Sequence, residues 1–161
     1  IIKKALWALK YSHKTSIAND ISCFTYEILL EELVDLKIFK AIESFVVIPI
    51  PISTRRKFFR GYNQSLVLAK ELVKFDKKCF QLEKNVLFKI KNTKPQAQIK
   101  DRKIRLRNLK DSFKVKNKDL ILKKNILLVD DVTTTGATLV EAKNVLLKAG
   151  VKNVYAVTMA H

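Results

Sequence analysis

Two adjacent carboxylates, Asp130 and Asp131, follow an apolar run and precede a short loop of threonines and one glycine. The run, Ile126 to Val129, predicts a buried strand, and the apolar residues spaced at three and four after Thr138 predict a helix. The loop between them lies at the carboxyl end of a strand, where open α/β sheets bind their ligands. We expect the two acids either to accept hydrogen bonds from sugar hydroxyls or to hold a water-ligated divalent cation.

The loop after the acids has the composition of an anion pocket. Backbone N–H groups around Gly136 and the amino end of the following helix attract negative charge. The residues expected to form this pocket are Thr133, Thr134, Thr135, Gly136, Ala137 and Thr138. A phosphate pocket beside a diol-or-metal site indicates a ribose 5-phosphate group.

Two other interpretations fit parts of this segment. One Asp at the end of a strand often only caps a helix. A nucleotide-hydrolase magnesium strand also ends in acids, but it needs a Gly-x-x-x-x-Gly-Lys-Ser/Thr loop elsewhere. Glycine occurs here only at positions 61, 136 and 150, so the chain has no such loop.

A second basic loop follows the predicted strand Phe45 to Ile50, which Pro51 stops. If this strand neighbours the Asp130 strand, both loops face one crevice. Backbone N–H groups and guanidinium forks would then bind an anion, because arginine makes paired contacts to phosphate. The residues of this predicted anion loop are Ser53, Thr54, Arg55 and Arg56. The alternative interpretation is an ordinary basic turn.

The segment Arg60-Gly61-Tyr62-Asn63-Gln64 comes next. Gly61 permits an unusual backbone angle. Asn63 is as well suited to cap the next helix as to bind a ligand. Arg60 and Gln64 have less structural reason to be there.

Alternating strands and helices predict an α/β fold with a parallel sheet and right-handed crossovers. The predicted strands are Phe45–Ile50, Val86–Ile90, Ile126–Val129 and Val154–Met159. The predicted helices cover residues 2–9, a segment from Thr15 or Ser16 to Leu36, residues 66–73 and residues 139–149, with Gly150 at the C-cap. Residues 91–100 predict a mobile loop, followed by a basic helix to about Lys110. We expect one domain over 1–161, with a helical part at 1–42 and a core at 43–161.

The charge is strongly basic, with 32 Lys and Arg against 15 Asp and Glu, for a net charge of +17. Basic residues crowd together between Lys89 and Lys124, which favours polyanionic partners. The alternative is a lysine-rich protein with solvated faces. Three aromatics near the second loop, Phe58, Phe59 and Tyr62, are either core residues or stacking platforms for bases.

Other features limit the class of protein. The two cysteines, Cys23 and Cys79, form no Cys-x-x-Cys pair, which predicts reduced thiols and a cytoplasmic location. No apolar run is long enough to span a bilayer. His13 and His161 have no ligand-spaced neighbours and predict no metal site. Because the chain opens on Ile1, we expect a segment to precede it.

The stretch Leu127-Leu128-Val129-Asp130-Asp131-Val132-Thr133-Thr134-Thr135-Gly136-Ala137-Thr138 resembles the 5-phosphoribosyl-1-pyrophosphate (PRPP) motif of type I phosphoribosyltransferases. Three further segments are similar to the ComF branch of that superfamily. They are Ile48-Pro49-Ile50-Pro51 with Arg55-Arg56 and Arg60-Gly61-Tyr62-Asn63-Gln64, then Thr93-Lys94-Pro95-Gln96 with Asn108 and Phe113, and Leu9-Lys10-Tyr11. The resemblance covers most of the chain.

The resemblance implies a central, mostly parallel sheet flanked by helices, with N-terminal helices and a mobile hood. It implies PRPP and Mg²⁺ as ligands, catalytic roles for Asp130, Asp131, Arg55 and Arg56, and metal binding by the two acids, directly or through water. It also implies that the loop from Ser53 to Arg56 holds pyrophosphate. The implied hood residues are Arg60, Gly61, Tyr62, Asn63, Gln64, Gln96, Arg105, Arg107 and Asn108.

The implied function is transfer of a phosphoribosyl group with release of pyrophosphate, in the context of DNA uptake and natural competence, with the acceptor left open. The alternative is a non-catalytic protein of the same fold that binds single-stranded DNA. Purine-type relatives often place an acid where this chain has Thr133 and Thr134, which argues against a purine-salvage substrate. ComF-like proteins usually carry an upstream cysteine-rich zinc module, which this sequence lacks. A dimer is compatible with the family, and the oligomeric state stays open.

Overall fold

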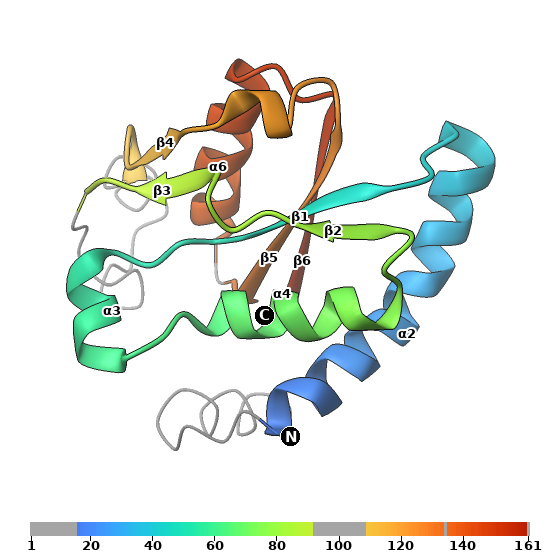
Figure 1. Cartoon of the computed structure of the whole chain (residues 1–161), viewed down its shortest axis with the longest axis horizontal. Coiled ribbons are helices and arrows are strands. Elements are labelled where there is room, and N and C mark those ends of the chain that lie inside the picture. The colour runs from blue at the N-terminus through green and yellow to red at the C-terminus, as the bar shows by residue number, and fades with distance from the viewer. Residues whose placement is uncertain (1–15, 92–108, 134, 161) are drawn as a thin grey trace.

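The computed structural model describes residues 16–91, 109–133 and 135–160, apart from the side chains of Ser16, Ile17, Phe39, Arg60 and Ala160. Its centre is a sheet of four parallel strands in the order β2-β1-β5-β6 (Figure 1). The strands are β1 (Phe45–Pro49), β2 (Phe80–Leu82), β5 (Asn125–Val132) and β6 (Asn153–Ala160). The predicted α/β fold with a central parallel sheet is confirmed.

Helices cover both faces of this sheet, so strand residues of either parity are buried. Val47 of β1 belongs to a core formed with α2 (Ser16–Lys40) and α4 (Gln64–Phe75). Val46 of β1 belongs to a second core formed with α6 (Ala137–Lys148) on the other face. Burial on both faces explains why these strands are continuous apolar runs rather than alternating ones.

The helix predictions agree with the structure where it describes them. The helix expected from Thr15 or Ser16 is α2, the one around residues 66–73 is α4, and the one after Thr138 is α6. Gly150 follows the last turn of α6 with φ +93°, as expected of a glycine at a helix end. The helix predicted at 2–9 lies outside the described residues. So does the basic segment 92–108, although Leu109 is helical.

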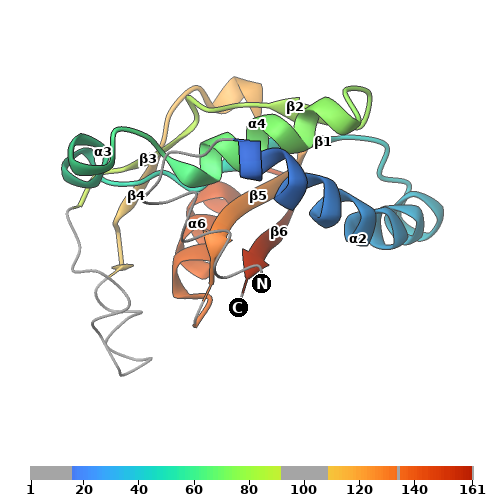
Figure 2. The ribbon, with the colours of Figure 1, turned by 90° about the horizontal axis from the view of Figure 1, so that it is seen from below.

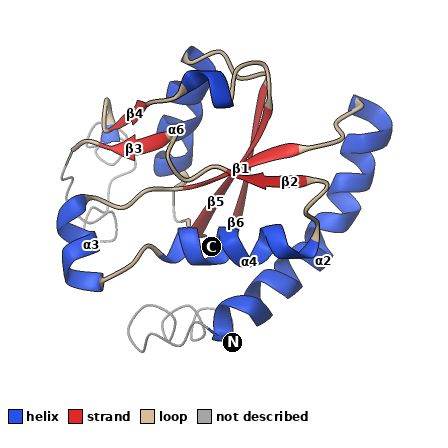
Figure 3. Cartoon of the chain, viewed as in Figure 1, coloured by secondary structure: helices blue, strands red, loops and turns tan. Residues whose placement is uncertain are grey.

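The prediction that Val86–Ile90 joins the central sheet is wrong. Residues Leu87–Lys89 form β3, which pairs antiparallel with β4 (Phe113–Val115) in a separate two-stranded sheet (Figure 3). The edge of the central sheet is instead β2, whose three residues are too short to give a periodic signal. Leu87 and Phe113 pack into the core under α6, so burial, rather than sheet membership, explains the apolar residues of this run.

A short helix, α3 (Thr54–Arg60), replaces the loop expected after Pro51. Figure 2 shows α3 and the β3–β4 ribbon at one end of the molecule and the carboxyl-terminal part of α2 at the other. A 3₁₀ turn at Lys118–Leu120 leads into β5. Among the described helices, none is long and apolar enough to cross a membrane.

Candidate functional site

The two predicted loops do meet at one edge of the sheet. Strands β1 and β5 are hydrogen-bonded neighbours, with Pro49 opposite Val129. The backbone N–H of Ile50 donates to the carbonyl of Val129 at 2.9 Å, so the segments that follow β1 and β5 leave the sheet side by side. The Asp130 loop and the α3 segment therefore border the same carboxyl edge, as the sequence predicted.

Asp130 is the more deeply buried of the two acids, with 8% of its surface exposed. Its Oδ1 accepts hydrogen bonds from the Ser65 hydroxyl at 3.1 Å and from the Asp131 N–H at 2.9 Å. The Ser65 hydroxyl comes from the first turn of α4. Asp130 is thus fixed between the end of β5 and the start of α4.

Burial raises the pKa of Asp130 to about 8, and the neighbouring Asp131 charge adds to the increase. A carboxyl in this state holds its proton at neutral pH unless a cation or a hydrogen-bond donor stabilises the charge. Raised pKa values of this kind gather at functional sites.

Asp131 is only half-buried, and its Oδ1 accepts the Val132 N–H at 2.9 Å. In the described part of the chain, no cluster of three or more His, Cys, Asp or Glu side chains is arranged to hold a metal. Two carboxylates nevertheless fit Mg²⁺, which usually keeps several waters and takes its other ligands from substrate phosphates. A divalent cation would also favour ionised Asp130, so the residues present fit the predicted metal.

The threonine loop has the geometry of an anion pocket at the start of α6. Gly136 is the N-cap, with φ +70°, and it offers no side chain to cap the first-turn N–H groups. The described threonines of the loop, Thr133, Thr135 and Thr138, are all half-buried. Ala137 is buried, and Thr134 lies outside the described residues. Unlike a Ser or Asp cap, Gly136 leaves these donors to a ligand.

The two arginines of α3 occupy different environments. Ser53 is the N-cap of this helix, and its side chain accepts the Arg56 N–H at 3.5 Å. Arg55 is exposed, and its guanidinium lies 5.9 Å from the centre of the Phe59 ring. Arg56 is half-buried, and its positive charge lowers the pKa of Lys89. The prediction treated the pair as equivalent, whereas of the two only Arg56 is partly buried and lies near Lys89.

Residues 60–64 connect α3 to α4 through two helix caps. Gly61 ends α3 with φ 76°. Asn63 caps α4, since its Oδ1 accepts the Ser65 N–H at 3.2 Å and its Nδ2 donates to the Ile50 carbonyl at 2.9 Å. The structural interpretation of Asn63 is therefore correct: it holds Ser65, and through it Asp130, against the end of β1. Gln64 is buried and Tyr62 is half-buried.

The predicted hood residues Gln96, Arg105, Arg107 and Asn108 lie outside the described residues, as does the side chain of Arg60.

Two residues near the site were not singled out from the sequence. Ser65 donates to Asp130 across 65 positions of sequence, and no local pattern reveals such a contact. Lys89 of β3 lies near both Arg56 and Asp130. Burial and the Arg56 charge lower its pKa to about 8, and the Asp130 charge acts in the opposite direction. An amine in this position adds a second cation beside Arg56 at the carboxyl edge.

Comparison with known proteins gives a consistent result. No family model matches the chain. Competence protein F of Haemophilus influenzae is 34% identical over 113 residues, which cover 67% of this chain and 46% of that protein. DNA utilization protein YhgH of Escherichia coli O157:H7 is 30% identical over 147 residues, which cover 91% of this chain and 61% of that protein. Competence protein ComFC of Bacillus subtilis is 29% identical, with 90% and 65% covered.

The chain thus spans between 46% and 65% of the length of these relatives. Among solved structures, a hypoxanthine phosphoribosyltransferase from Staphylococcus aureus superposes with a TM-score of 0.50 at 16% identity. The match covers 88% of this chain and 62% of that one. At that identity the likeness concerns the fold alone. Together with the parallel sheet and the acid–threonine–glycine loop at its carboxyl edge, these similarities show that the chain belongs to the ComF family, which has the type I phosphoribosyltransferase fold.

Proposed function

We propose that this chain binds PRPP with Mg²⁺ at the carboxyl edge of the sheet and transfers its phosphoribosyl group to an acceptor still to be identified. One observation carries the proposal. The buried Asp130, beside Asp131, lies directly before the uncapped start of α6 and across the edge from the α3 arginines. A sugar diol, a 5-phosphate and a pyrophosphate therefore each have a fitting set of groups.

Each part of PRPP is assigned to its own side chains. The N–H groups at Gly136 to Thr138 and the threonine hydroxyls bind the 5-phosphate. Asp130 and Asp131 accept hydrogen bonds from the ribose hydroxyls, and Ser65 keeps Asp130 in place. Arg56 and Lys89 bind the pyrophosphate. The assignments follow the chemistry of each group and the order of the segments along the edge.

In the reaction, the bond from the anomeric carbon to pyrophosphate breaks and pyrophosphate leaves with the electron pair. A nucleophilic atom of the acceptor bonds to that carbon and loses a proton. Positive charge develops on the ribose, near the Asp130 carboxylate, and negative charge develops on the leaving group, near Arg56 and Lys89. Fixed charges that match a developing charge lower the barrier. Bound Mg²⁺ would add further stabilisation of the leaving pyrophosphate.

The names of the curated relatives refer to competence and DNA utilization. We extend that role to this chain, so the reaction or the binding would serve the handling of DNA during its uptake.

A thermal-shift experiment tests the proposal. PRPP with Mg²⁺ should raise the melting temperature of the full chain by mass action, and the variant Asp130→Asn/Asp131→Asn should lose that shift. The matched control Asp119→Asn changes an exposed acid in the turn before β5 and should keep it. An equal shift in the double variant would rule out these acids as ligands of PRPP.

One observation favours the second candidate, binding of single-stranded DNA. Phe58 and Phe59 on α3 are 84% and 74% exposed, so they are not core residues. Their rings lie edge to face at 5.9 Å, with Arg55 beside Phe59. Exposed aromatics among cations are the usual stacking platforms for bases.

Fluorescence anisotropy with a labelled oligothymidylate across a salt series tests this candidate. The logarithm of affinity should fall linearly with the logarithm of salt concentration, by about 0.7 per phosphate neutralised. Phe58→Ala/Phe59→Ala should weaken binding by about 1–3 kcal/mol per lost stack. The control Phe24→Ala removes an exposed ring from α2 and should have no effect. Loss of affinity in the control to the same extent would exclude α3 as the binding surface.

A further inference from the structure

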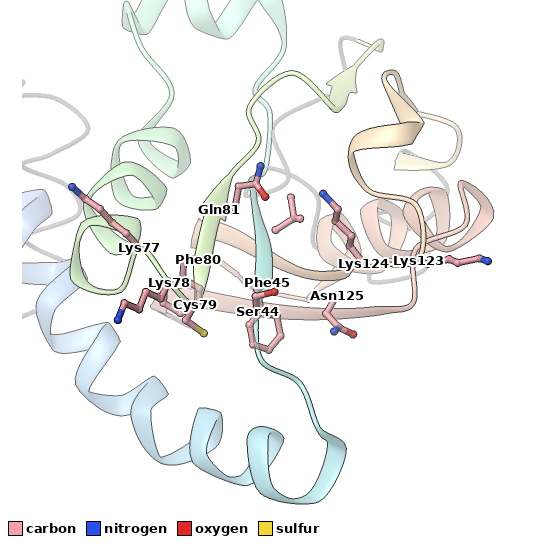
Figure 4. A pocket seen from close by; sticks show the side chains of 11 residues that line it. Ser44, Phe45, Lys77, Lys78, Cys79, Phe80, Gln81, Lys123, Lys124 and Asn125 are labelled. Atoms are coloured by element: carbon pink, nitrogen blue, oxygen red, sulfur yellow. The ribbon is translucent and has the colours of Figure 1, made fainter.

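A hollow of about 510 Å³ opens at the edge of the sheet opposite the candidate site (Figure 4). The first residues of three strands, Phe45, Phe80 and Asn125, line it, so it lies at the amino edge. Its size falls within the range of small-molecule pockets. The lining residues are Ser44, Phe45, Val46, Lys77, Lys78, Cys79, Phe80, Gln81, Lys123, Lys124 and Asn125.

The charged residues that line the hollow are all basic. Two turns each contribute a pair of lysines: residues 77 and 78 before β2, and residues 123 and 124 before β5. None of the described residues that line it is acidic. In Figure 4 Lys77 and Lys78 extend on one side of β1, Lys124 lies on the other side, and Lys123 extends away from the other lining residues. Lysine heads on flexible stems turn readily toward a bound anion.

Two acids that neighbour lining residues in the sequence, Asp76 and Glu83, accept hydrogen bonds around β2. Asp76 Oδ1 accepts the N–H groups of Lys78 and Cys79 at 3.1 and 2.9 Å. Glu83 Oε1 accepts the Gln81 side-chain amide at 3.3 Å. Both carboxylates keep their negative charge, but the four lining lysines outnumber Asp76, Glu83 and Glu43, the acid beside Ser44, so the net charge around the hollow is positive.

Neutral donors complete the lining. Asn125 Oδ1 accepts the Asn153 amide at 2.9 Å, which orients the NH₂ group of Asn125 away from Asn153. Ser44 is exposed and adds a hydroxyl. Backbone donors at the floor are occupied, because the Phe45 N–H donates to Cys79 and the Phe80 N–H donates to Asp76. Side chains, rather than the backbone, therefore determine what binds.

We propose that this amino-edge hollow is a second anion site, which takes a small, multiply charged phosphate compound of the oligophosphate or nucleoside triphosphate class. Lys77, Lys78 and Lys124, on flexible stems that can turn toward a ligand, match a ligand with several negative charges. Because lysine acts as a point charge and arginine as a planar fork, the hollow selects total charge more than the geometry of one phosphate. The site is separate from the PRPP crevice and does not depend on that assignment.

The probe is inorganic triphosphate, added to the ¹⁵N-labelled full chain and followed by NMR. We expect saturable shifts of the Gln81 and Asn125 amides. The variant Lys77→Gln/Lys78→Gln/Lys124→Gln should weaken this binding roughly tenfold or more, since three partly screened charges are lost. Lys124→Gln alone should weaken it less, which guards against misfolding of the triple variant.

The matched control Lys70→Gln/Lys114→Gln/Lys143→Gln removes the same charge from exposed positions on α4, β4 and α6. It should leave the saturation at Gln81 and Asn125 within about twofold of the parent, because charges beyond a Debye length are screened. ATP in place of triphosphate distinguishes a nucleotide from a bare oligophosphate, and either one binding supports the site. Three results would overturn the proposal: equal weakening in both triple variants, shifts confined to residues 133–138, or binding of oligothymidylate without binding of either small phosphate.

Discussion

The two edges of the central sheet are made by the same parallel strands and have opposite chemistry. At the carboxyl edge, carboxylates, hydroxyls and an uncapped helix start follow β5, and Asp130 lies near Lys89, which in turn lies near Arg56. At the amino edge, short turns carry lysine pairs around a hollow whose described lining has no acid. The carboxyl edge has a distinct group for each part of a ligand, whereas the amino edge has mainly charge. We therefore propose specific recognition at the carboxyl edge and charge-based binding at the amino edge of the same parallel sheet.

The largest expected effect separates the two arginines of α3. Arg56→Ala should weaken PRPP binding by about 1.5–3 kcal/mol, or roughly tenfold to more than a hundredfold, because a charged contact at a partly buried site is lost. Arg55→Ala should cost far less, since Arg55 is exposed beside Phe59. Calorimetric titration of both variants, with PRPP and with ribose 5-phosphate, measures the difference. If Arg56→Ala affects the two ligands equally, Arg56 is not a pyrophosphate ligand.

The next prediction compares two lysines of the β3–β4 ribbon, Lys89 near the carboxyl edge and Lys114 on the partner strand. Lys89→Met should reduce PRPP affinity by about tenfold, because one partly buried cation near Arg56 and Asp130 is removed. Lys114→Met, an exposed lysine on the partner strand, serves as the control and should change little. A similar loss in both variants would show that overall charge, not the position of Lys89, governs binding.

Gly136 tests whether the backbone of the phosphate loop matters. Its φ of +70° makes Gly136→Ala destabilising by about 1–2 kcal/mol, although a Cβ would meet no atom within 4 Å. Gly136→Asn should recover most of that stability, because Asn tolerates the left-handed region. Its side chain would cap α6 and compete for the N–H donors, so phosphate binding should stay weak. Denaturant melts and PRPP titrations would separate the two effects, and normal binding by Gly136→Asn would contradict them.

The last comparison concerns pH. The pKa of Asp130 is raised to about 8 in the folded chain, against about 4 when unfolded. The folded state therefore holds this proton more tightly, and the stability that it contributes is fully present below pH 4 and lost as pH rises to 8. Urea unfolding without Mg²⁺ should show Asp130→Asn gaining stability relative to the parent across that range. Parallel pH profiles for the two proteins would mean that Asp130 is not perturbed.

Much of the carboxyl edge was predictable because its signals are local. The run from Ile126 to Val129, the acid pair and Gly136 lie within one strand–loop–helix segment, and hydrophobic periodicity identifies both flanking elements. The sequence predicts that the two loops meet only if β1 and β5 are neighbours. The register shows that these two strands are hydrogen-bonded neighbours.

The features that were missed depend on contacts between distant segments. The Ser65–Asp130 hydrogen bond spans 65 positions, and Lys89 reaches the site only because β3 pairs with β4 instead of joining the central sheet. The exposure of Phe58 and Phe59 is likewise set by the packing around α3, since their apolar character alone favours burial. The amino-edge hollow joins the turn at residues 77 and 78 to the turn at residues 123 and 124, and each turn by itself is an ordinary basic turn.

Hydrogen-exchange mass spectrometry of the full chain with and without PRPP and Mg²⁺ tests the central claim most directly. Phosphate binding should protect amides in peptides that cover residues 130–140, because the loop and first-turn N–H groups become donors to the ligand. Peptides that cover residues 76–82 and 121–126 should be unchanged. Protection at the amino edge without protection at 130–140 would contradict the assignment of sugar-phosphate chemistry to the carboxyl edge.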